Sequence, residues 1–153
     1  MTLPAQVASV RRAIRRLMTR RLSERTSRPF SQLLALKVIA EEDLLTQAAL
    51  AEHLLMDAPA VSRLVDRLEN DGLVKRCAGE NRRCVRLQAT EAAKAEVAVL
   101  REAAQWVDNE AGRYLTPAEM QELNRLLEKL RNGLTQSHEA PEGACVEPVE
   151  APR

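Results

Sequence analysis

Residues 46–90 read TQAALAEHLLMDAPAVSRLVDRLENDGLVKRCAGENRRCVRLQAT and carry the clearest structural signal in the chain. Thr46 precedes an apolar-rich segment, which predicts a short helix with this threonine as its N-cap. Asp57 and Pro59 open a second helix, because aspartate is a preferred N-cap and proline is favoured in the first turn. We expect that helix to end at Gly72, since glycine most readily forms a left-handed C-terminal cap.

The second of these helices is amphipathic. Its apolar residues recur at i, i+3, i+4 and i+7 spacing and should face a core: Val61, Leu64, Val65 and Leu68. Its other face carries hydrogen-bonding side chains: Ser62, Arg63, Asp66, Arg67 and Asn70. Such a helix fits the DNA major groove, which admits one helix and presents a distinct donor and acceptor pattern for each base pair. The alternative is a solvated face on which Asp66 and Glu69 pair with the arginines.

Two short strands, at about residues 73–77 and 84–89, should follow this helix. In the second strand apolar and polar residues alternate, as in a half-exposed strand. The loop between the strands contains Arg82 and Arg83, whose guanidinium groups suit phosphates or a narrow minor groove.

Longer helices are predicted on both sides of this segment, at about 4–24 and 30–42 and from Thr90 and Thr116 onward. In the two helices after Thr90 and Thr116, apolar residues repeat at alternating spacings of four and three, which gives heptad-like seams. The small central domain can bury only one face of such helices. A twofold homodimer is the commonest closed way to bury the other. A monomer whose helices fold back on the core is the alternative.

These elements predict a mainly α (α+β) fold, a winged helix-turn-helix domain with flanking helices that form a dimerisation domain. We assign residues 1–29 to an N-terminal dimerisation helix and 30–90 to the winged helix-turn-helix DNA-binding domain. Residues 91–135 form the C-terminal dimerisation helices. Residues 136–153 are rich in proline and glutamate and poor in large apolar residues, which is typical of a disordered tail.

Composition narrows the functional classes. Aromatic residues make up only 2% of the 153 residues, which argues against a protein that stacks single-stranded bases. The net charge is only +1, but residues 11–28 hold eight arginines and one glutamate, so the basic part fits an anionic partner. The cysteine count is odd, and neither a secretion signal nor a membrane-spanning run occurs. We therefore expect a cytoplasmic protein with no membrane partner and reduced thiols.

No enzymatic pattern is apparent, so we expect a protein that is not an enzyme. The glycines are scattered without a phosphate-binding motif. Neither histidine, His53 nor His138, has cysteine or carboxylate neighbours at zinc spacing, so we expect no metal and no cofactor. A rival of another class is a protein-binding helical adaptor without DNA binding. That function would leave the basic loop unexplained.

Two further clusters have alternative interpretations. Arg12 and Arg16 lie one helical turn apart and could grip the carboxylate of an anionic effector; the alternative is a solvated stripe partnered by acidic residues of the dimerisation helices. Cys77 and Cys84 bracket the charged loop beside basic residues, which favour the reactive thiolate. A redox-sensing site is one hypothesis for this pair, and two inert thiols are the other.

The sequence resembles the MarR family of bacterial winged-helix regulators over about residues 5–135. The resemblance rests on LAEHL, on VSRLVDRLENDGLVKR, and on NRR before a strand that ends in Thr-Glu. It implies a homodimer that binds a palindromic double-stranded DNA operator, usually as a repressor released by a small aromatic acid or by cysteine oxidation. It implies that residues 58–67 form the recognition helix, with Ser62, Arg63 and Arg67 facing DNA, and that Arg82 enters the minor groove. Ala58, Ala60 and Arg83 complete the residues that we predict to bind DNA. The chain departs from the family where Asn81 replaces the usual aspartate, which removes a charge partner of Arg82.

Overall fold

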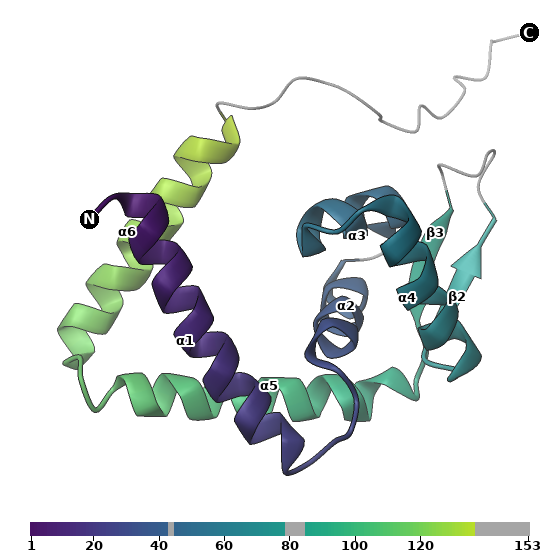
Figure 1. The fold of residues 1–153 in the computed structure, drawn as a ribbon, viewed down its shortest axis with the longest axis horizontal. Coiled ribbons are helices and arrows are strands. Elements are labelled where there is room, and N and C mark those ends of the chain that lie inside the picture. The colour runs from purple at the N-terminus through teal and green to yellow at the C-terminus, as the bar shows by residue number, and fades with distance from the viewer. Residues whose placement is uncertain (43–44, 79–84, 137–153) are drawn as a thin grey trace, which may run out of the picture. The chain divides into compact units, whose positions relative to one another are not determined.

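The computed structural model describes residues 1–42, 45–78 and 85–136. The described residues form two compact units, with the boundary between Asp108 and Asn109. The elements shown in Figure 1 are α1 (Leu3–Ser23), α2 (Phe30–Glu41), β1 (Leu45–Thr46), α3 (Gln47–Leu54), α4 (Ala58–Asn70), β2 (Val74–Cys77), β3 (Arg86–Ala89), α5 (Ala93–Ala111) and α6 (Pro117–Gln136). Helix α5 passes from the first unit into the second. Within the described ranges, no helix is long and apolar enough to cross a membrane.

Local capping produces the helix-turn-helix of the first unit. The Thr46 hydroxyl oxygen accepts a hydrogen bond from the Ala49 amide at 3.1 Å, and this starts α3. The Asp57 carboxylate accepts one from the Ala60 amide at 2.7 Å at the start of α4. Gly72 follows α4 with a φ of 74°. Both N-caps and the left-handed glycine were predicted from the sequence and are confirmed.

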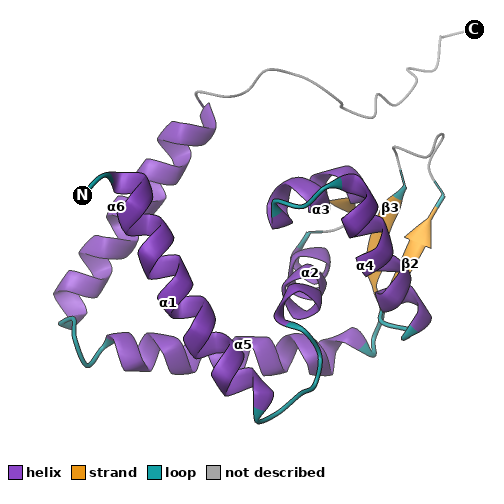
Figure 2. Cartoon of the chain, viewed as in Figure 1, coloured by secondary structure: helices purple, strands orange, loops and turns teal. Residues whose placement is uncertain are grey.

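The sheet is antiparallel, with strand order β1-β3-β2. Strands β2 and β3 lie beside α4 in Figure 2. In their register, Val74 pairs with Ala89 and Cys77 pairs with Arg86. The sequence did not predict β1. It is only two residues long, too short for an alternating pattern, and it is held by the pairing of buried Leu45 with Leu87.

Two apolar clusters hold the first unit together. The larger one joins α2, α3, α4, the sheet and the start of α5, and it includes all four predicted apolar residues of α4. The smaller one joins the C-terminal half of α1 to α2 and α5: Met18, Leu22, Leu33, Leu100, Ala103 and Val107. Helix α2 contributes to both clusters, as expected for a helix that is apolar nearly all round.

The predicted start of α5 at Thr90 is wrong by three residues. The Thr90 hydroxyl donates a hydrogen bond to the Gly72 carbonyl at 2.6 Å, and the Thr90 amide donates to the Leu73 carbonyl at 3.0 Å. Thr90 therefore fixes the residues between α4 and β2, and the helix begins at Ala93.

In the second unit, a capping box begins α6. The Thr116 amide donates to the Glu119 carboxylate at 2.8 Å, and the Glu119 amide donates back to the Thr116 hydroxyl at 3.3 Å. The Thr116 hydroxyl also donates to this carboxylate at 3.0 Å, and the hydrogen bonds from the Thr116 amide and hydroxyl lower the pKa of Glu119 below its ordinary value. No residue of α6 is buried within the described part of the chain.

Leu55, in the turn between α3 and α4, has a φ of 52°, a left-handed conformation that costs a leucine about 1–2 kcal/mol. Its side chain is 83% exposed, so little packing is lost by removing it. We expect Leu55→Gly to raise the free energy of unfolding by roughly 0.5–1 kcal/mol, because strain relief exceeds the entropy cost of glycine. Urea titration measures this. Leu55→Ala is the control and should change the free energy of unfolding little. If Leu55→Gly is no more stable than Leu55→Ala, the prediction is wrong.

Candidate nucleic-acid interface

The exposed face of α4 is fixed by its buried face. Val61, Val65 and Leu68 are fully buried, so the opposite side of the helix must point to solvent. Of the residues predicted to contact DNA, Ala58, Arg63 and Arg67 are exposed, and Ala60 and Ser62 are partly exposed. The structure therefore brings the five predicted α4 residues onto the accessible part of one helix.

Arg76 of β2 clamps α4 to the start of α3. Its guanidinium donates to the Asp66 carboxylate at 2.6 Å, to Glu69 at 3.4 Å and to the Ser62 carbonyl at 3.2 Å. Two further contacts of 3.4 Å reach the side-chain oxygen of Gln47. The Arg76 amide also donates to Glu69 at 3.1 Å. One side chain thus joins the strand that leads to the wing with both helices of the helix-turn-helix.

The contacts of Arg76 bear on the alternative interpretation of the α4 outer face, in which Asp66 and Glu69 pair with the α4 arginines. Asp66 and Glu69 pair with Arg76, not with Arg63 or Arg67. Arg63 has no ion pair to any residue in the described ranges. Its guanidinium is exposed beside carboxylates that another cation already neutralises, which leaves it available to an anionic or hydrogen-bonding ligand.

Arg67 has a different environment, at the C-terminal end of α4. Its Nε lies 3.6 Å from a carboxylate oxygen of Asp71, and the same oxygen accepts a hydrogen bond from Arg28 at 2.8 Å. The hydrogen bond from Arg28, with a smaller contribution from Arg67, lowers the pKa of Asp71 below its ordinary value. Arg28 lies just before α2 and also donates to the Gln32 side chain at 2.9 Å.

The predicted residues of the wing loop lie mostly outside the described ranges: Arg82, Arg83 and Cys84. Their assigned roles stay predictions. Cys77 is described as a free, partly exposed thiol whose register partner is Arg86. The redox hypothesis for Cys77 and Cys84 therefore also stays a prediction.

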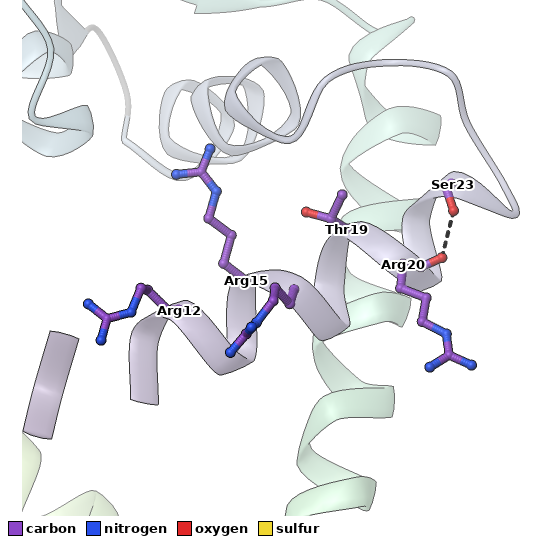
Figure 3. A pocket seen from close by; sticks show the side chains of 6 residues that line it. Arg12, Arg15, Thr19, Arg20 and Ser23 are labelled. Atoms are coloured by element: carbon purple, nitrogen blue, oxygen red, sulfur yellow. Dashed lines mark hydrogen bonds between the residues drawn. The ribbon is translucent and has the colours of Figure 1, made fainter. Parts of the chain in front are cut away.

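The predicted effector residues Arg12 and Arg16 line an open hollow of about 550 Å³ along α1 (Figure 3). The other lining residues are Arg15, Thr19, Arg20 and Ser23. Figure 3 shows side chains that spread apart and do not converge on one point. Arg15 lies 5.5 Å from the centre of the Phe30 ring. Neither Arg12 nor Arg16 pairs with an acidic residue within the described ranges.

The contacts of Arg28 and Arg76 were not predicted from the sequence. The sequence held a clue to the contacts of Arg76. This arginine is the last residue of GLVKR, and the helix before it carries two carboxylates one turn apart, Asp66 and Glu69. The sequence held no such clue for Arg28, because its partner Asp71 lies 43 residues away along the chain. His53 lies on α3, and its Nε2 is 3.0 Å from a carboxylate oxygen of Glu42. Among the described residues, no group could hold a metal ion.

A helix-turn-helix followed by a two-stranded wing stem, with arginines on the outer face of its second helix, defines a winged helix-turn-helix DNA-binding regulator. Residues 26–83 match the sequence model of the MarR family, a stretch that includes α2, the helix-turn-helix and β2. Solved structures of the same family match nearly the whole described chain. The family model and these structures together support a MarR-family winged-helix transcriptional regulator.

Three solved structures illustrate the likeness. Apo wild-type MarR from E. coli is 26% identical with a TM-score of 0.73, and the match covers 85% of this chain and 97% of that one. The transcriptional regulator PA3341 is 28% identical with a TM-score of 0.72, over 88% and 99% of the two chains. The transcriptional regulator SlyA, 22% identical with a TM-score of 0.71 over 90% and 96%, shares the fold. A search of curated protein sequences found no match.

Proposed function

We propose that this regulator is a homodimeric repressor that binds a palindromic duplex through paired α4 helices and is released by a small anionic effector. The observation that carries the proposal is the state of Arg63. It is exposed and has no ion pair among the described residues, while Arg76 occupies the neighbouring carboxylates. An exposed guanidinium without an ion-pair partner can form two hydrogen bonds to a guanine edge in the major groove.

Unburied apolar seams support the homodimer. On α1, four residues spaced by four, three and four positions are between 43% and 58% exposed: Leu3, Val7, Val10 and Ile14. On α6, four leucines are between 41% and 58% exposed: Leu123, Leu126, Leu127 and Leu134. Helix α1 belongs to the first unit and α6 to the second. Each helix has an apolar face that remains exposed. A second copy related by a twofold axis would bury such faces.

The dimer links the protein's symmetry to that of its DNA. Two α4 helices related by a twofold axis read the same sequence on opposite strands, so the preferred site is a palindrome. The half-sites should lie about one helical turn, 34–36 Å, apart. Arg82, the predicted wing residue, would contact the flanking minor groove in this arrangement.

The hollow along α1 supports the proposed effector. Arg12 and Arg16 have long, flexible side chains without a described acidic partner, and one guanidinium can grip a carboxylate bidentately. A small aromatic acid would draw these side chains together. Isothermal titration with salicylate as the probe, on the unaltered protein and on Arg12→Gln/Arg16→Gln, tests the site; equal heats from both proteins would reject it.

The DNA-binding proposal is tested by selection of duplexes from a random-sequence pool with the full-length protein. A gel shift at a stated salt concentration then compares the recovered duplex with a scrambled one. We expect a palindromic consensus and preferential binding to it. A protein that recovers no consensus and binds both duplexes equally at low salt would contradict the proposal. Reporter transcription with the recovered site then separates repression from activation.

The dimer itself gives a separate prediction. We expect Leu127→Glu in α6 to convert the dimer to monomers, because a glutamate in the seam would have to lose its hydration on association. Its effect on the folding of one chain should be small, since the side chain is already 48% exposed there. Sedimentation velocity measures the assembly state. Gln121→Glu, on the same helix but outside the seam, is the matched control; an unaltered chain that sediments as a monomer would refute the dimer.

A further inference from the structure

We infer that Arg28 is a positioning residue for DNA binding: it takes the closer position on the Asp71 carboxylate and so weakens the hold of Asp71 on Arg67, which can then turn to the duplex. The inference rests on the proposed role of α4 in contacting DNA. It assigns a function to a residue outside the helix-turn-helix, in the segment between α1 and α2.

The first observation is the shared carboxylate oxygen. Arg28 donates to the Asp71 Oδ2 at 2.8 Å, within hydrogen-bond distance, whereas Arg67 Nε lies 3.6 Å from the same atom. Arg67 and Asp71 are one turn apart on α4, the spacing at which an arginine and an aspartate pair directly. Arg28 therefore holds the closer position, and Arg67 remains at the longer distance.

The second observation is the difference in exposure. The Arg28 side chain is 19% exposed and that of Asp71 is 28% exposed, whereas Arg67 is 69% exposed. Arg28 is held from several sides: it donates to Gln32, and its Nε lies 3.7 Å from Glu96 of α5. The held guanidinium cannot easily leave Asp71, while the Arg67 guanidinium extends into solvent and can reorient toward a phosphate or a base.

The consequence follows from charge balance at Asp71. Without Arg28, the Asp71 carboxylate has only Arg67 to neutralise it within this cluster, and the i, i+4 ion pair, at 3.6 Å in this structure, should tighten. Arg67 would then turn along the helix axis toward Asp71. Binding DNA would require that pair to break first, which lowers affinity.

The test measures affinity of the full-length protein for the duplex that the unaltered protein selects from a random-sequence pool, at fixed salt. We expect Arg28→Gln to weaken binding about tenfold, the order expected when one arginine contact is lost. Arg25→Gln is the matched control: it removes the same charge from the same region, and its partner at 3.0 Å is Glu102, not a residue of α4. It should change affinity less than twofold. An equal loss in both variants would overturn the inference.

A second pair of variants separates positioning from simple support of the fold. Asp71→Asn breaks the same contact as Arg28→Gln, so a purely supporting contact would weaken binding in both. We expect Asp71→Asn to bind at least as tightly as the unaltered protein, and the double variant to match Asp71→Asn. An Asp71→Asn variant that loses as much affinity as Arg28→Gln would overturn the inference.

The Arg67→Ala background distinguishes this inference from the proposed function. If Arg28 acts through Arg67, Arg28→Gln should change affinity less than twofold once Arg67 is absent. A tenfold loss that persists in the Arg67→Ala background overturns the inference and leaves the DNA-binding role of α4 intact. If Arg67→Ala alone leaves affinity unchanged, the assignment of Arg67 to the DNA contact fails, and the role of Arg28 fails with it.

Discussion

Replacing Arg63 by alanine should lower the affinity for the selected duplex by about 1–3 kcal/mol, the usual contribution of a bidentate arginine–guanine contact. The structure explains why the loss should appear in binding and not in folding. Arg63 is exposed and makes no ion pair with a described residue. Its removal should therefore change the free energy of unfolding by less than about 0.5 kcal/mol, as for most surface substitutions.

Loss of base preference is the sharper readout for Arg63. A residue that reads one base pair should, when removed, relax the consensus at that position and leave the other positions unchanged. Repeating the duplex selection with Arg63→Ala measures this directly. Arg25→Ala is the control, because it removes a half-exposed arginine of the same unit that lies outside α4. A variant that weakens all duplexes equally would show that Arg63 contacts phosphates, not bases.

The parts of the interface that the sequence predicted correctly are those set by local interactions. The caps of α3 and α4 depend on contacts three residues apart, from Thr46 to Ala49 and from Asp57 to Ala60. The direction of the α4 outer face depends only on helical periodicity, and the burial of Val61 and Leu68 confirms it. Such features need no knowledge of the tertiary fold.

The contacts that hold the arginines in place were not predictable in the same way. Arg28 meets Asp71 across 43 residues, and Arg76 meets Gln47 across 29. Both pairs depend on how the elements pack. In the sequence, Asp66 and Glu69 are the nearest carboxylates to Arg63 and Arg67. Only the position of β2 beside α4 shows that Asp66 pairs with Arg76.

The apolar seams of α1 and α6 illustrate a third case. Their periodicity was visible in the sequence, but one chain does not bury them: Val10 is 58% exposed and Leu127 is 48% exposed. The seam pattern therefore shows which helices need a packing partner. It does not show what that partner is. Sedimentation of the unaltered protein supplies the missing information.

Replacing Arg76 by glutamine should weaken both folding and DNA binding. The guanidinium contacts Asp66, Glu69, the Ser62 carbonyl and Gln47. Asp66 and Glu69 are about half exposed, so water can solvate them when Arg76 is lost. We therefore expect destabilisation of only about 1–2 kcal/mol, below the cost of breaking a fully buried pair. Urea titration measures this part.

The effect of Arg76→Gln on DNA binding should be larger than the destabilisation explains. Asp66 lies three residues after Arg63, so a carboxylate freed from Arg76 can pair with it on the same helix face. The two freed charges would also repel phosphates. We expect a loss of at least tenfold for the selected duplex, measured where the variant is fully folded. Lys75→Gln is the matched control, because it removes a charge from the neighbouring exposed residue of β2.

A compensating substitution identifies the cause of that loss. If Arg76 acts by keeping Asp66 away from Arg63, then Asp66→Asn in the Arg76→Gln background should restore most of the affinity, although it cannot restore the contacts to Ser62 and Gln47. Arg76→Lys should restore less, because a single ammonium cannot span the acceptors that the planar guanidinium reaches. If the double variant binds no better than Arg76→Gln alone, the role of Arg76 is to hold α4 in place, and the neutralisation of Asp66 contributes nothing to DNA binding.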